Sequence, residues 1–135
     1  MNLERINPTE LGQPSGFSHA VSLSATASRL VFLAGQLGTG RDGTIVPGGI
    51  VAQFEQALAN LLAALAAAGG QPADLASLTV YLTDLEDYQA HGKDIGAVWR
   101  RLAGPEYPAM AGVGVTRLWL PGALVEIQGV AVVGA

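Results

Sequence analysis

The chain has 135 residues, of which 50% are apolar and 13% are charged, with a formal net charge of −4 at pH 7. This length and composition predict one folded domain with a real core and argue against disorder. The acidic balance and the scattered basic residues argue against a nucleic-acid partner. The absence of cysteine excludes disulfides, thiolate metal sites and a cysteine nucleophile. No signal-peptide core or bilayer-spanning run is evident, so we expect a cytoplasmic protein without a membrane partner.

The first part of the chain predicts an arm and two strands. Residues 1–16 are rich in proline and glycine and are expected to form an irregular N-terminal arm of the single domain 1–135. The stretch 17–25 alternates apolar and polar residues, which predicts a strand. The stretch 29–36, "RLVFLAGQ", is more continuously apolar and predicts a second strand that is buried on both faces.

A glycine-rich segment follows, with Gly38, Gly40 and Gly43 at the spacing of a dinucleotide-binding fingerprint. That fingerprint needs a helix to begin at the glycines, so that the helix N-terminus meets the pyrophosphate. Here Asp42-Gly43 predicts a hairpin turn, and residues 44–47 read as extended, as a short third strand. We therefore interpret the segment as a turn and expect no nucleotide cofactor.

The remaining elements alternate helix and strand before the chain ends in two strands. Residues 48–70 predict a helix with one apolar stripe and with Gln53, Gln56 and Asn60 on the opposite side. A strand is expected at 74–83, then a second helix that Asp84 caps and that ends at Gly104. Strands at about 110–118 and 123–133 complete an α+β domain. Its order is β-β-α-β-α-β-β, with two helices on one face of a mixed sheet. The other face is also apolar, and a partner subunit is its simplest cover.

These elements, in this order, resemble the RidA family, also called YjgF. The segments that carry the resemblance are "RINP" (5–8), "GFSHAV" (16–21), "LVFLAGQ" (30–36), "VYLTDLEDY" (80–88), "YPAMAGVGVTRL" (107–118) and "ALVEIQGVAV" (123–132). The resemblance implies a chorismate-mutase-like fold and a homotrimer with small-molecule clefts between its subunits. It also implies hydrolysis of reactive enamines and imines, such as 2-aminoacrylate, to a keto acid and ammonia, without metal or organic cofactor.

The family's site residues carry over to this chain in part. Glu126 matches the last-strand glutamate that works with a water, and it is the catalytic candidate. The ligand-binding candidates are the "GQ" pair with the residue before it, the aromatic position, and the segment after "YPA": Ala34, Gly35, Gln36, Phe17, Met110 and Ala111. Phe17 stands where the family has a tyrosine, and it has no hydroxyl.

Met110 is the main departure, because the family's active members have an arginine here that holds the substrate carboxylate. Losing a charge-assisted clamp costs on the order of a hundredfold in affinity. Arg117 is not an obvious replacement, because an odd spacing along an extended strand turns it to the opposite face. A neutral or amide-like ligand suits Met110 and Phe17 better than a free α-imino acid.

Each candidate also has a structural interpretation. Glu126 could accept backbone hydrogen bonds, Met110 could fill a gap in the core, and Phe17 could be core as well. His19 is better explained as structural, and the histidine spacing predicts no metal site. The alternative function is a non-catalytic trimer that binds a metabolite or a regulatory partner. RNA cleavage, attributed to some relatives, is disfavoured by the acidic charge.

Overall fold

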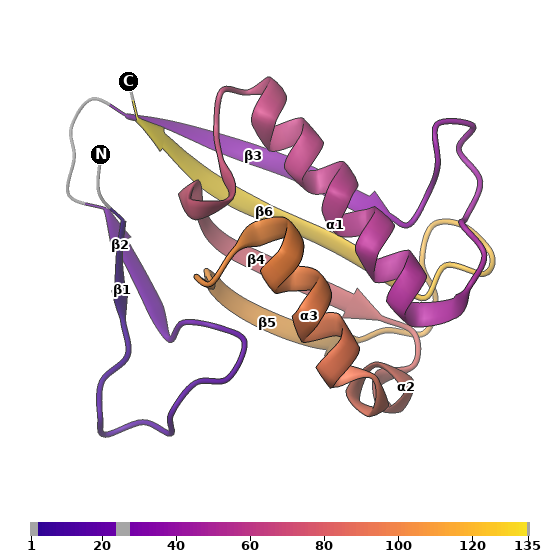
Figure 1. The fold of residues 1–135 in the computed structure, drawn as a ribbon, viewed down its shortest axis with the longest axis horizontal. Coiled ribbons are helices and arrows are strands. Elements are labelled where there is room, and N and C mark those ends of the chain that lie inside the picture. Colours follow the sequence, from indigo (N-terminus) through magenta and orange to yellow (C-terminus); the bar gives the residue numbers. More distant parts are fainter. Residues whose placement is uncertain (1–2, 24–27, 135) are drawn as a thin grey trace.

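The computed structural model describes residues 3–23 and 28–134, and Figure 1 shows their arrangement. The strands and helices, in chain order, are β1 (Leu3–Ile6), β2 (Ala20–Leu23), β3 (Ser28–Leu37), α1 (Gly49–Ala67), the 3₁₀ turn η1 (Pro72–Asp74), β4 (Leu75–Leu82), α2 (Leu85–Ala90), α3 (Gly92–Ala103), β5 (Ala109–Gly114) and β6 (Val125–Gly134).

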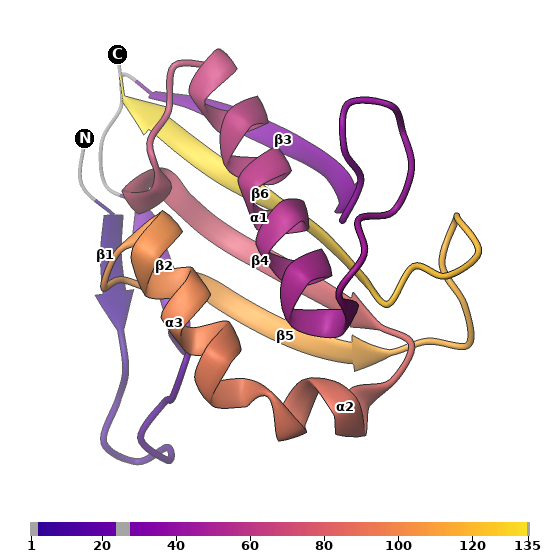
Figure 2. The same cartoon turned by 45° about the vertical axis from the view of Figure 1, so that its right-hand side comes forward.

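The main sheet has four strands in the order β3-β6-β4-β5. β4 and β5 run parallel, whereas β6 pairs antiparallel with both β3 and β4. Figures 1 and 2 show α1 and α3 side by side across one face of this sheet, and β1 and β2 as a separate hairpin at its edge. The predicted α+β class, with a mixed sheet and its helices on one face, is confirmed.

Strand β4 shows how the sheet separates its two faces. Leu78, Val80 and Leu82 are at most 2% exposed and face the helices, as the alternation in the sequence predicts. Thr79 and Tyr81 alternate with them and point to the other face. A residue of β5 or β6 lies on the same face of the sheet as the β4 residue with which it pairs. The pairing with β4 therefore shows which residues of β5 and β6 face the helices and which face the other way.

Helix α1 supplies the centre of the core. Ala57, Leu58, Leu61 and Leu65 have no exposed surface, and all of them lie on the stripe that packs against the sheet. By length and composition alone α1 is the one helix of the described residues that could cross a membrane. Its contacts with the sheet make it the core helix of the domain.

The polar side of α1 differs from the prediction, because Gln53 is only 4% exposed. Its side chain donates to the carbonyl of Gly122 at 3.1 Å and accepts from the amide of Leu124 at 2.8 Å. Asn60, about two turns further along α1, donates to the carbonyls of Leu37 and Thr39. These amides therefore hold the loops at the ends of β3 and before β6, where backbone groups lack strand partners.

The glycine-rich segment 38–48 is a loop, and no helix begins until Gly49, which confirms the rejection of a dinucleotide fingerprint. Gly38 packs directly on α1, since a Cβ at this position would lie 2.8 Å from the Cα of Gln53. The turn around Asp42 and Gly43 brings Thr39 and Ile45 into an antiparallel bridge. The glycines thus serve close packing and a tight turn.

Several predictions of the elements need correction. The strand at 29–36 was expected to be buried on both faces, yet Leu30 and Phe32 of β3 are 61% and 76% exposed, because they lie on the face without helices. The strand expected at about 110–118 is β5, which ends at Gly114. The N-terminal arm was expected to be irregular, yet Leu3–Ile6 forms β1 and pairs with β2. The first predicted strand, 17–25, is reduced to β2, and its last two positions lie outside the described residues. The second predicted helix is two helices, α2 and α3, because the backbone leaves the helical region at His91 (φ −106°, ψ 19°). The Asp84 cap is confirmed by its 3.0 Å hydrogen bond from the amide of Asp87.

Candidate functional site

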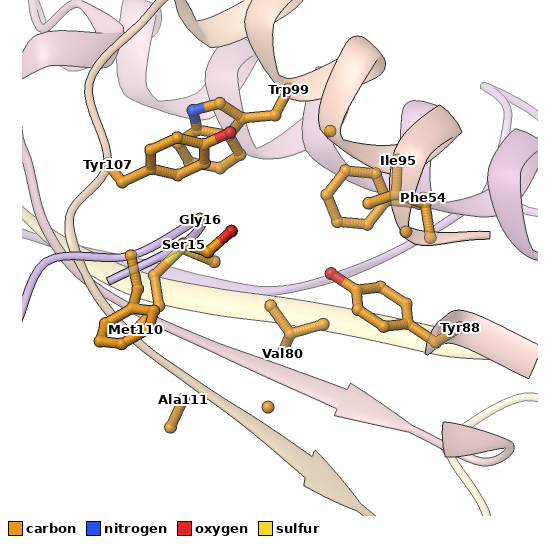
Figure 3. Close-up of a pocket in the computed structure, with 14 residues that line it drawn as sticks. Ser15, Gly16, Phe54, Val80, Tyr88, Ile95, Trp99, Tyr107, Met110 and Ala111 are labelled. Atoms are coloured by element: carbon orange, nitrogen blue, oxygen red, sulfur yellow. The ribbon is translucent and has the colours of Figure 1, made fainter. Parts of the chain in front are cut away.

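A pocket of about 450 Å³ lies between α3, strand β5 and the chain segment 15–17. Figure 3 shows its wall, with the rings of Trp99 and Tyr107 on one side and Val80 of the sheet below. Phe17, Met110 and Ala111, three of the predicted ligand-binding residues, all line it. β5 is an edge strand of the sheet, and in the described residues its outer side pairs only with Ser18, through an isolated bridge to Ala109.

Backbone contacts hold the segment with Phe17 against β5. The amide of Ser18 donates to the carbonyl of Pro108 at 2.8 Å, and its hydroxyl donates to the carbonyl of Tyr107 at 2.7 Å. Ser18 is buried, although it is polar, because both of its donors are satisfied here. Arg5 of β1 adds an ion pair with Glu106, at 2.6 Å. The N-terminal arm is therefore one wall of the pocket.

Aromatic side chains form most of the opposite wall. Trp99 and Tyr107 stack with ring centroids 5.1 Å apart and an interplanar angle of 14°. The indole N–H of Trp99 donates to the carbonyl of Glu106 at 3.1 Å, which fixes the ring. Phe54 and Tyr88 meet edge to face at 6.0 Å. These pairs make a rigid apolar surface.

Tyr88 brings a hydroxyl to this surface, directed toward the middle of the pocket (Figure 3). Burial raises the pKa of Tyr88, and the nearby Tyr107 raises it further. Tyr88 therefore stays protonated at physiological pH and can donate a hydrogen bond.

Glu126 lies elsewhere in the chain, in a hollow of about 600 Å³ that Arg117, Leu118 and Trp119 also line. It is half-buried, and its carboxylate lies over Gly35, where a Cβ would come within 2.9 Å of Cδ and would overlap Oε2. Gly35 thus leaves the space that this side chain occupies. Arg117 shares the hollow, but within the described residues no basic group forms an ion pair with Glu126.

The sheet register separates Glu126 from Met110. Glu126 pairs with Tyr81, on the face without helices, whereas Met110 pairs with Leu78, on the face that α1 and α3 cover. A single chain therefore forms two partial sites, one with Phe17, Met110 and Ala111, and one with Gly35 and Glu126. Ala34 and Gln36 flank Gly35 at a bulge of β3 and do not line the pocket.

Apart from Phe17, the aromatic residues of the pocket were not predicted from the sequence. Tyr88 and Trp99 lie within the second predicted helix, where periodicity alone does not distinguish a core side chain from a pocket wall. Tyr107 lies inside the "YPA" segment but was not singled out. In the described part of the chain no three His, Asp or Glu side chains converge on a possible metal site.

Comparison with known proteins assigns the family. Residues 9–133 match the model of the family described as Endoribonuclease L-PSP. The chain is 34% identical to the goat 2-iminobutanoate/2-iminopropanoate deaminase over 114 residues, 84% of this chain and 80% of the relative. It is 37% identical to the Escherichia coli RutC family protein YjgH over 114 residues, 84% of this chain and 82% of that protein.

Solved structures agree with this assignment. A Yersinia pestis protein of unknown function, YyfB of the conserved Rid protein family, superposes with a TM-score of 0.84 at 35% identity, over 97% of this chain and 98% of that one. Escherichia coli TdcF, solved with bound serine, superposes with a TM-score of 0.69 at 27% identity, over 98% and 100% of the two chains. The protein belongs to the Endoribonuclease L-PSP family, the RidA or YjgF family that its sequence resembles.

Proposed function

We propose that this protein is a hydrolytic deaminase of imines and enamines, and that it needs neither a metal nor an organic cofactor. The observation that carries the proposal is the carboxylate of Glu126, seated over Gly35 at the edge of an open hollow. Relatives at 34% identity bear the name of an imine deaminase, which supports the same reaction class here.

The reaction converts R₂C=NH and water into R₂C=O and ammonia. Glu126 takes a proton from a water as its oxygen attacks the imine carbon, and it returns the proton to the nitrogen. This gives a carbinolamine, whose hydroxyl then passes its proton through Glu126 to the nitrogen. The C=O bond forms as the C–N bond breaks, and ammonia leaves. An enamine reacts in the same way after it tautomerises to the imine. A positioned carboxylate contributes about 10²- to 10⁴-fold to such proton transfers.

The complete site lies between copies of the chain, in a homotrimer. Met110 and Glu126 face opposite sides of one sheet, so a cleft that uses both needs Glu126 from a neighbouring copy. Leu30 and Phe32 of β3 are 61% and 76% exposed on the face without helices, and this apolar surface suits burial against a second copy. In a trimer, the pocket with Met110 of each copy lies beside the sheet face with Glu126 of the next copy, and the three contacts form a closed ring.

The alternative is a trimer that binds a metabolite or a regulatory partner without turning it over. Met110 favours this alternative, because methionine offers no donor to a substrate carboxylate. The acidic net charge of −4 disfavours an RNA substrate in either case.

The test is ammonia release from imines generated in situ, with Glu126→Gln as the variant and Glu86→Gln, an exposed carboxylate of α2, as the matched control. We expect the wild type and the control to accelerate hydrolysis and Glu126→Gln to lose at least about a hundredfold. Ligand-dependent thermal stabilisation without acceleration would support the binding alternative. Equal turnover by Glu126→Gln would refute the role of this residue.

A further inference from the structure

Three of the four glycines that line the 450 Å³ pocket lie on a helix or a strand: Gly92 and Gly96 on α3, and Gly112 on β5. A Cβ built on any of them meets no atom within 4 Å. Their missing side chains are therefore not required by close packing inside the protein. Because these positions line the pocket, the space that side chains would take there is left open to a ligand.

The size of this space is that of a large ligand group. A cavity of roughly 150 Å³ is enough to bind benzene, about a third of the volume here. The stacked rings of Trp99 and Tyr107 and the edge-to-face pair of Phe54 and Tyr88 present flat apolar surfaces to it. A planar ring fits between such surfaces with favourable offset or edge contacts.

Among the described residues that line the pocket, none has a charged side chain. The indole N–H of Trp99 is already bound to the carbonyl of Glu106. The remaining polar side-chain groups are the hydroxyls of Tyr88, Tyr107 and Ser15, and none of the three makes a hydrogen bond within the described part of the chain. An ionised carboxylate that enters this pocket loses its water and gains no cation, so it is disfavoured. A neutral nitrogen or oxygen can accept a hydrogen bond from a tyrosine hydroxyl at no such cost.

We propose that this pocket selects imines with a bulky, ring-bearing apolar side chain and no carboxylate, as arise when a primary arylalkyl amine is oxidised. The inference rests on the proposed deaminase function and specifies its substrate class. The ring lies in the space left open at Gly96, in contact with the aromatic side chains of the pocket. The C=N group points to the mouth of the pocket at β5, where water adds to the carbon, the C–N bond breaks, and an aldehyde and ammonia leave.

Four imines generated in situ separate side-chain size from charge. An amine oxidase makes ethanimine from ethylamine and phenylethanimine from phenethylamine. An amino acid oxidase makes 2-iminopropanoate from alanine and 2-imino-3-phenylpropanoate from phenylalanine. Hydrolysis is followed as the loss of the semicarbazone that forms when semicarbazide captures the surviving imine. We expect kcat/KM for phenylethanimine to exceed the other three values by at least about tenfold.

A glycine variant tests where the ring binds. Gly96→Leu fills the pocket from α3, and the fold is retained because leucine is the better helix former. We expect it to lower kcat/KM for phenylethanimine at least about tenfold and to change that for ethanimine less than about threefold. Ala97→Leu, at the next and exposed position of α3, is the matched control and should change neither value.

The outcomes separate the two proposals. Preference for the small or the carboxylate-bearing imines, or equal turnover of all four, overturns this inference and leaves the deaminase function standing. An equal effect of Gly96→Leu on both uncharged imines overturns the placement of the ring. If none of the four imines is hydrolysed faster than in buffer, the proposed function fails, and this inference fails with it.

Discussion

Gly35 and Glu126 lie in contact across neighbouring strands, and the carboxylate of Glu126 occupies the space that a side chain at position 35 would need. Gly35 belongs to a bulge of β3, between Leu33 and Gln36, that shifts the register against β6. Bulges of this kind re-aim side chains next to functional sites. The glycine therefore sets where the proposed catalytic carboxylate points.

Gly35→Ala is expected to displace this carboxylate and not to unfold the protein. The displaced atoms are the end of a flexible side chain, so the free energy of unfolding should change by less than about 1 kcal/mol. A misplacement of roughly 1 Å lowers turnover by about a hundredfold. Imine hydrolysis and urea unfolding measure the two effects. Gly12→Ala is the control, because Gly12 has open space around it. Unchanged turnover in Gly35→Ala would contradict the role of this contact.

Met110→Arg should restore recognition of a carboxylate. The side chain lines the pocket near its mouth, so a guanidinium there could bind a substrate carboxylate with two hydrogen bonds. We expect kcat/KM for 2-iminopropanoate to rise by about ten- to a hundredfold. Met110→Leu, which keeps the volume and adds no charge, should produce no gain. A folded Met110→Arg protein without any gain would show that the rest of the cleft does not suit imino acids.

Phe32→Asp should dissociate the proposed trimer. Phe32 is 76% exposed in the single chain, and a carboxylate at its position would be buried without a partner in an interface. Light scattering on a size-exclusion column should show three times 13.8 kDa for the wild type and for Phe32→Leu, and 13.8 kDa for Phe32→Asp. A monomeric wild type would refute both the trimer and a site shared between copies.

Gln53→Leu should destabilise the fold without touching the pocket. It removes the partners of the Leu124 amide and the Gly122 carbonyl. Gly122 is exposed, so water can replace its partner, whereas the amide of the half-buried Leu124 is left unsatisfied at a cost of about 1–3 kcal/mol. Urea unfolding should therefore show a free energy of unfolding about 1 kcal/mol or more below that of the wild type. Gln89→Leu, at an exposed position of α2, is the control. A loss of under about 0.5 kcal/mol would mean that water replaces these hydrogen bonds.

The raised pKa of Tyr88 predicts that the free energy of unfolding falls at alkaline pH. Burial raises its pKa in the folded protein, so above about pH 10 the unfolded chain releases the phenol proton more readily than the folded chain does. The contribution of the protonated Tyr88 to the free energy of unfolding is fully present below this pH, and it is lost as the pH rises through the raised pKa. Urea unfolding between pH 8 and about pH 11 should show this loss, and Tyr88→Phe should reduce it. An identical slope in Tyr88→Phe would assign the loss to other groups.

The strands and helices of the core could be predicted because their signals are local. The alternation of Leu78, Val80 and Leu82 and the apolar stripe of α1 each record burial on one face. The break at His91 could not be predicted in this way, since Tyr88, Ile95 and Trp99 keep the spacing of one continuous helix. The burial of Gln53 was missed for a related reason. An amide on a helix looks exposed in sequence until a distant loop supplies its partners.

Residue type and order along the chain were enough to predict the family, the α+β class, the carboxylate of Glu126 and the absence of an arginine at Met110. The opposite orientation of Met110 and Glu126 could not be predicted in this way, since it follows from the register among β4, β5 and β6. The tertiary structure also brings four glycines and five aromatic residues from separate segments into one pocket. Such contacts join residues far apart in the chain, and local patterns carry no record of them.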